Sequence, residues 1–150
     1  MIVDANLLLY SVDVDSPHHG RAVEWLSSVL TGEVRVGLPV QTVGAFVRIV
    51  THPRAAQRPL TVEQAWEVVD GWLASPVAWV PAASVRTLRI TRDLMVRHHL
   101  GSGMATDTQL AALALEHGVP VVSADSDFAR FPEVTWINPV ASRERQTPQA

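Results

Sequence analysis

The chain has 150 residues, a formal net charge of −3 and no cysteine, and 47% of its residues are hydrophobic. This length and composition indicate one globular domain with a substantial core. The absence of cysteine excludes disulfides, thiolate metal sites and cysteine nucleophiles. All twelve basic residues are arginine, which excludes chemistry that requires lysine, such as phosphate-loop nucleotide binding and Schiff-base formation.

The amino-terminal stretch MIVDANLLLY does not resemble a signal peptide, because no basic residue precedes its short apolar part and Asp4 interrupts it. No apolar run approaches the roughly 18 residues of a membrane span. We therefore expect a cytoplasmic protein without membrane contact.

Short apolar strands alternate with helical patterns along the chain. Ser16 and Pro17 predict a helix start, with Ser16 as N-cap and Pro17 in the first turn. Thr61 and Gln64 have the spacing of a capping box. In chain order we expect strand 1–4, helices 5–10 and 17–30, strand 35–38, helices 39–51 and 62–74, strand 77–80, helices 84–99 and 105–117, and strands 119–122 and 134–137.

Glycines and polar residues mark the remaining boundaries. Residues 101–103, Gly-Ser-Gly, predict a flexible break before the last long helix, and Gly118 is a typical left-handed residue at that helix's end. We assign residues 1–138 to a single domain. Residues 139–150 are polar and are expected to be a frayed tail.

The alternation of strands and helices predicts an α/β fold with a parallel sheet and right-handed crossovers. Ligands of such sheets bind beyond the carboxyl ends of the strands, at a point where the winding reverses. Asp4 and Asp125 both lie just past predicted strands, and Asp107 lies at a predicted helix start. If the first and fourth strands are neighbours, about 5 Å apart, Asp4 and Asp125 can reach one ion.

Each aspartate also has an ordinary structural explanation. Asp4 can cap the following helix, and Asp107 can favour its own helix through the macrodipole. Asp125 and Asp127 can be turn residues. Their convergence at one predicted sheet edge nevertheless favours a shared site. Carboxylate oxygens are the ligands that Mg²⁺ and Mn²⁺ prefer, and such an ion lowers the pKa of a bound water and offsets charge on a phosphodiester.

The predicted helix 84–99 is rich in arginine. Arg86, Arg89 and Arg92 are candidate contacts to a phosphate backbone. Asp93 lies four residues after Arg89 and four before Arg97, so local ion pairs within the helix are the competing interpretation.

Three segments resemble the PIN-domain family, and within it VapC-type toxin ribonucleases: residues 1–10 (MIVDANLLLY), 106–114 (TDTQLAALA) and 123–128 (SADSDF). Residues 39–53 match more loosely, and the resemblance covers residues 1–138. It implies a three-layer α/β/α sandwich with a mainly parallel central sheet of about five strands. It also implies an endoribonuclease that depends on Mg²⁺ or Mn²⁺, cleaves single-stranded or loop regions of RNA, forms a homodimer and is neutralised by a cognate VapB-type antitoxin.

The resemblance assigns catalytic and metal-binding roles to the acidic positions. Asp4, Asp107 and Asp125 fall on the family's carboxylates, and Asp127 is an auxiliary metal ligand. The proposed supporting residues are Asn6, Thr106 and Ser123.

One position departs from the family pattern. The family usually has a glutamate in the helix after the second strand, where this chain has Ala45, and residues 34–62 contain no acidic side chain. The departure places a second metal ion in question. An alternative is therefore a weakly active or inactive PIN-like module that binds RNA or its antitoxin. A remote alternative is an α/β phosphotransfer enzyme that uses Asp4, although such folds typically rely on a lysine.

Overall fold

The computed structural model describes residues 1–141 and has a five-stranded parallel sheet at its centre. The strand order is β3-β2-β1-β4-β5, so the chain winds outward from β1 in one direction and then restarts on its other side. The point of reversal therefore lies between β1 and β4. The strands are β1 (Ile2–Val3), β2 (Val36–Gly37), β3 (Ala78–Trp79), β4 (Val121–Val122) and β5 (Trp136–Ile137).

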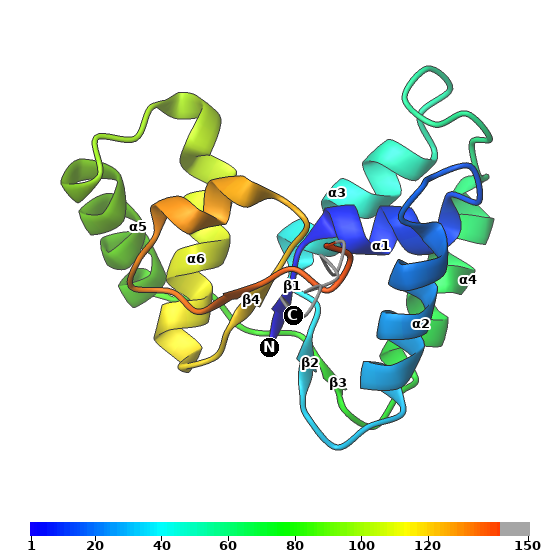
Figure 1. Ribbon diagram of the computed structural model, residues 1–150, viewed down its shortest axis with the longest axis horizontal. Coiled ribbons are helices and arrows are strands. Elements are labelled where there is room, and N and C mark those ends of the chain that lie inside the picture. Colours follow the sequence, from blue (N-terminus) through cyan, green and yellow to red (C-terminus); the bar gives the residue numbers. More distant parts are fainter. Residues whose placement is uncertain (142–150) are drawn as a thin grey trace, which may run out of the picture.

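Helices cover both faces of this sheet, which confirms the α/β/α sandwich (Figure 1). One face packs against α1 to α4, and the other against α5, α6 and a short 3₁₀ helix, η2. The helices are α1 (Ala5–Val12), α2 (His19–Leu30), α3 (Val40–Val50), α4 (Val62–Leu73), α5 (Val85–Arg97), η1 (Ser102–Met104), α6 (Ala105–His117) and η2 (Ser126–Arg130).

Alternation along the strands divides the core between the two faces. Val3 and Val122 belong to the cluster beneath α1 to α4, whereas their neighbours Ile2 and Val121 belong to the cluster beneath α5 and α6. All four are almost completely buried, as expected for strands covered on both faces. The residue directly after such a strand therefore lies at the edge of the sheet.

One predicted helix start and one predicted helix end are confirmed, and another predicted helix start is wrong. Thr61 and Gln64 form the expected capping box, and Gly118 ends α6 with φ of 64°. However, α2 begins at His19 rather than at Pro17. The Ser16 hydroxyl accepts the N–H of His18 at 3.2 Å, so Ser16 closes a turn that precedes the helix instead of capping it.

Two segments expected to be irregular are ordered. The predicted flexible break contains η1, whose side chain at Met104 is buried. Val140 lies in the predicted tail but is buried, and its carbonyl accepts a hydrogen bond from Arg21 at 2.9 Å. The chain therefore returns to the core after β5, and the prediction for residues 142–150 lies outside the described residues.

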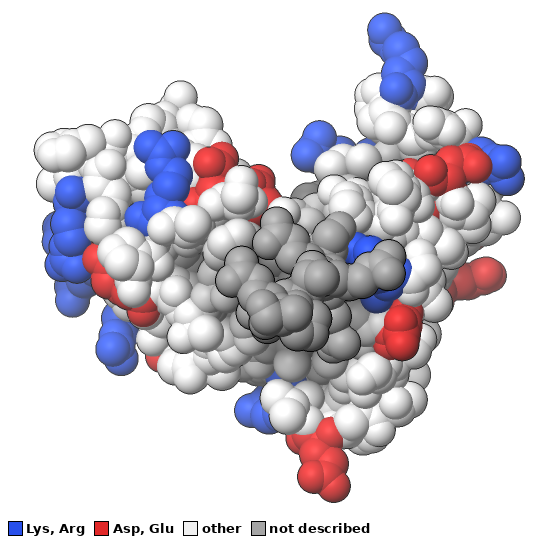
Figure 2. Space-filling view, in the orientation of Figure 1, with Lys and Arg blue, Asp and Glu red and all other residues white. Residues whose placement is uncertain are grey.

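The molecule has two arms separated by a notch (Figure 2). One arm contains α5 and α6, and the other contains α1 to α4 (Figure 1). Within residues 1–141, no helix is long and apolar enough to cross a membrane.

Candidate carboxylate site

Asp4 is held at the end of β1 by three hydrogen bonds. Its Oδ1 accepts the N–H of Ala5 at 2.7 Å. Its Oδ2 accepts the Ser123 hydroxyl at 2.6 Å and the Asn6 amide at 2.9 Å. The capping role weighed for Asp4 is therefore present, and the same carboxylate is also joined to the segment after β4.

Ser123 and Asn6 connect the ends of β1 and β4. The Asn6 amide also donates to Ser123 Oγ at 2.9 Å, while its Oδ1 accepts the N–H of Ala124 at 3.2 Å. Ser123 Oγ in turn accepts the N–H of Asp125 at 3.0 Å. Ser123 is completely buried. This network fixes the relative positions of Asp4 and Asp125 at the reversal point of the sheet.

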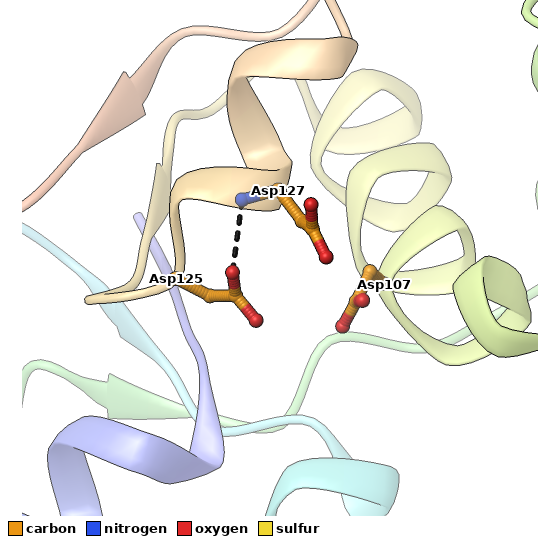
Figure 3. Close-up of side chains that lie close together, drawn as sticks. All are labelled: Asp107, Asp125 and Asp127. Carbon is orange, nitrogen blue, oxygen red and sulfur yellow. Dashed lines mark hydrogen bonds between the residues drawn. The ribbon is translucent and has the colours of Figure 1, made fainter.

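Three carboxylates gather beside this network. Asp107 on α6, Asp125 after β4 and Asp127 on η2 each offer an oxygen, and these oxygens lie within 4.8 Å of one another (Figure 3). Asp125 Oδ1 accepts the N–H of Asp127 at 2.8 Å, which starts η2 and orients both side chains. Acidic side chains are visible on the inner side of the α5–α6 arm, facing the notch (Figure 2).

The site carries an electrostatic cost without a cation. Partial burial, together with the charges of Asp4, Asp125 and Asp127, raises the pKa of Asp107 to about 6 from an ordinary 3.8. Burial also raises the pKa of Asp4, with the charge of Asp125 adding to it, although the bonds from Ser123 and Ala5 act in the opposite direction. The charge of Asp4 therefore interacts with those of Asp107 and Asp125, although its oxygens are not among those that lie within 4.8 Å of one another.

Two other positions singled out in the sequence, Thr106 and Ala45, are not part of the carboxylate group. Thr106 is exposed and its hydroxyl makes no hydrogen bond within residues 1–141, whereas Thr108 is buried and its hydroxyl donates to the Met104 carbonyl at 2.7 Å. Ala45 is half-buried on α3. α3 carries no acidic residue, and the third carboxylate of the tight group is Asp127 on η2. The pattern Asp-x-Asp followed by Phe was the sequence signal for this.

Within residues 1–141, no ion pair or hydrogen bond joins the arginines of α5 to the carboxylate group. Arg86, Arg89 and Arg92 are exposed on α5, and Arg89 lies about 200° around the helix from buried Thr87. The expected ion pairs within α5 are wrong in detail. Asp93 pairs with the adjacent Arg92 at 2.8 Å, and Arg97 pairs with Glu133 at 2.8 Å. Glu133 also bonds His98, so tertiary contacts compete with the helical spacing.

A separate hollow was not anticipated from the sequence. It has a volume of about 310 Å³ and lies between α1, α3 and the segment that links α3 to α4. Its lining includes Leu9, Tyr10, Ile49 and Leu60, and Arg58 and Asp13 also contribute. It contains none of the clustered carboxylates.

Comparison with known proteins identifies the family of this chain. Residues 1–134 match the PIN domain. The chain is 42% identical over 140 residues to ribonuclease VapC37 of Mycobacterium tuberculosis, covering 93% of this chain and 97% of that protein. It is 36% identical to ribonuclease VapC33 of the same species, with 93% and 98% covered.

A solved structure has the same fold. The crystal structure of VapBC2 from Rickettsia felis bound to a DNA fragment from its promoter superposes with a TM-score of 0.66 at 14% identity, covering 91% of this chain and 96% of that chain. The chain therefore belongs to the PIN-domain family, in its VapC-type branch.

Proposed function

We propose that this protein is an endoribonuclease toxin of a toxin–antitoxin system, acting in the cytoplasm on single-stranded or loop regions of RNA with Mg²⁺ or Mn²⁺. The observation that carries the proposal is the group formed by Asp107, Asp125 and Asp127, with Asp4 beside it. The ribonuclease names of relatives at 36–42% identity support RNA as the substrate.

The donor set fits a hard divalent cation. It consists entirely of carboxylate oxygens, which Mg²⁺ and Mn²⁺ favour. Burial, followed by repulsion from the neighbouring carboxylates, raises the pKa of Asp107, and a cation would offset this repulsion. Asp107, Asp125 and Asp127 would hold the ion, with Asp4 as a further ligand or as an orienting group.

When bound, such an ion supplies a water of lowered pKa and positive charge against a phosphodiester. The residues of this chain orient the carboxylates that would hold the ion. Ser123 and Asn6 occupy Asp4 Oδ2, and Ala5 occupies Oδ1, so the carboxylate of Asp4 cannot turn freely. Asp125 Oδ1 accepts the N–H of Asp127, and its Oδ2 accepts no hydrogen bond within residues 1–141.

The test is cleavage by purified, antitoxin-free protein of an RNA hairpin with an exposed loop. Wild type is expected to cut in Mn²⁺ and not in EDTA. Asp4→Asn and Asp107→Asn are expected to keep their circular dichroism spectra and lose cleavage, whereas Asp70→Asn, an exposed carboxylate on α4, keeps it. Full activity of either site variant, or activity in EDTA, rejects the assignment. RNA binding by the wild type without cleavage would favour the binding module that the absent glutamate suggests.

We further propose two protein partners. The antitoxin is supported by the VapC names of the relatives and by the hollow between α1 and α3, whose apolar lining offers contacts for a partner's side chains. A homodimer is supported by Val85, Leu88 and Val96 on α5, which are 65–69% exposed and which association would remove from water. Light scattering of the protein alone and with its antitoxin measures both assemblies.

A further inference from the structure

The short helix η2 carries Arg130 three residues after Asp127 of the carboxylate group. In a 3₁₀ helix residues three apart align, with a rise of about 2 Å per residue. Phe128 lies within η2 and Phe131 is the residue that caps its end, and both are almost completely buried. Their burial fixes the rotation of η2. Asp127 and Arg130, also three apart, therefore lie on a second ridge of the same helix, roughly 6 Å apart along its axis.

Arg130 is not neutralised by a carboxylate. Its side chain is exposed and makes no ion pair or hydrogen bond within residues 1–141. This distinguishes it from Arg58, Arg92 and Arg97, which pair with acidic side chains at 2.8–3.3 Å. Its guanidinium keeps all of its hydrogen-bond donors for an external acceptor, and their forked arrangement matches a phosphate.

Other unpaired arginines lie on other elements. Arg89 is on the outer side of α5, and Arg48 and Arg54 belong to α3 and the segment after it. Only Arg130, among the described arginines, shares a helix with a member of the carboxylate group. Basic side chains lie next to the acidic ones on the α5–α6 arm (Figure 2).

We propose that Arg130 binds a backbone phosphate of the RNA adjacent to the one at the carboxylate site. The inference rests on the proposed ribonuclease function and specifies how that site holds its substrate. A polyanion that approaches several carboxylates is repelled, and a fixed positive charge on the same ridge offsets part of this repulsion. The contact is made equally before and during the reaction, so it contributes to binding rather than to the chemical step.

The experiment compares Arg130→Ala, Arg130→Lys and the control Arg54→Ala, an exposed arginine in the segment after α3, on a labelled single-stranded oligoribonucleotide. Arg130→Ala is expected to raise KM about tenfold with kcat within about twofold, as for loss of one uniform charged contact. In metal-free titrations its affinity should depend less on salt, with a log–log slope smaller by about 0.7. Arg130→Lys should keep the salt slope and recover part of KM, and Arg54→Ala should match wild type.

Melting temperatures establish that each variant is folded, and Arg130→Lys carries the test if Arg130→Ala is not. Equal KM and salt slopes in wild type and Arg130→Ala overturn the assignment, as does an equal loss in Arg54→Ala. If wild type cuts RNA while Arg130→Ala behaves identically, only this inference fails. If wild type neither binds nor cuts RNA, the proposed function fails with it.

Discussion

Replacing Asp107 with asparagine removes one charge from the carboxylate group while keeping the shape of the side chain. Without a cation, the charges of Asp4, Asp125 and Asp127 and partial burial all disfavour ionised Asp107. We therefore expect Asp107→Asn to be more stable than wild type in EDTA at pH 7.5, although it removes a residue of the proposed active site.

The magnitude follows from the pKa of Asp107. Its increase from 3.8 to about 6 corresponds to about 3 kcal/mol at about 1.36 kcal/mol per pKa unit. The side chain is only partly buried, so solvent screening reduces this to about 1–2 kcal/mol. Loss of an acidic residue from the first turn of α6 costs about 0.3–1 kcal/mol. The net gain is about 1 kcal/mol, or about 2–4 °C in melting temperature.

The sign of the pH dependence distinguishes repulsion from other causes. Below pH 3.8 Asp107 is protonated in both the folded and the unfolded state, and its raised pKa has no effect on stability. Between 3.8 and about 6 only the unfolded state ionises, so folding loses stability as the pH rises, and above about 6 the full cost is present. The difference between Asp107→Asn and wild type should therefore narrow as the pH falls from 7.5 to 4.5.

The assay is thermal unfolding in EDTA and in Mn²⁺, with Asp70→Asn as the control. Mn²⁺ should raise the melting temperature of wild type more than that of Asp107→Asn, because an ion that binds the folded state stabilises it by mass action. The reasoning is refuted if Asp107→Asn melts below wild type by the same margin at pH 7.5 and 4.5 and gains as much from Mn²⁺. Asp107 would then act only as a helix-start charge.

Two hydroxyl groups give further predictions. Ser123→Ala leaves Asp4 without its 2.6 Å hydrogen bond and should lower the free energy of unfolding, measured in urea, by about 1–3 kcal/mol. The same variant should cleave RNA more slowly. Unchanged cleavage would show that this bond does not position Asp4. Thr42→Val removes the buried bond from Thr42 to the Val3 carbonyl at 2.9 Å and should cost about 1–3 kcal/mol, whereas Thr42→Ser, which keeps the hydroxyl, should cost clearly less. Equal losses in the two Thr42 variants would assign the effect to packing.

Several features could be predicted because neighbouring residues encode them. The capping box of Thr61 and Gln64 and the left-handed Gly118 depend on local hydrogen bonds and backbone preferences. The positions of Asp4 and Asp125 after apolar strands were likewise readable, since a parallel sheet collects its strand ends at one edge. The alternation of strands and helices was enough to predict a parallel α/β sheet, and the resemblance to the PIN-domain family implied the three-layer sandwich.

Other features depend on which segments pack together. The sequence did not state that β4 lies beside β1, yet this pairing brings Ser123 to Asp4 across 119 residues of chain. Arg97 pairs with Glu133, 36 residues away, instead of with Asp93 in α5, because a side chain can pair with any group that the fold brings close to it.

By itself, then, the sequence determined the local elements and the presence of an acidic sheet edge. Only the tertiary structure decided which carboxylates lie closest and which arginines remain without a partner. Asp127 joins Asp107 and Asp125 because Phe128 and Phe131 anchor η2 in the core. The physical reason is that backbone preferences act over a few residues, whereas the distances between charges depend on how whole layers pack.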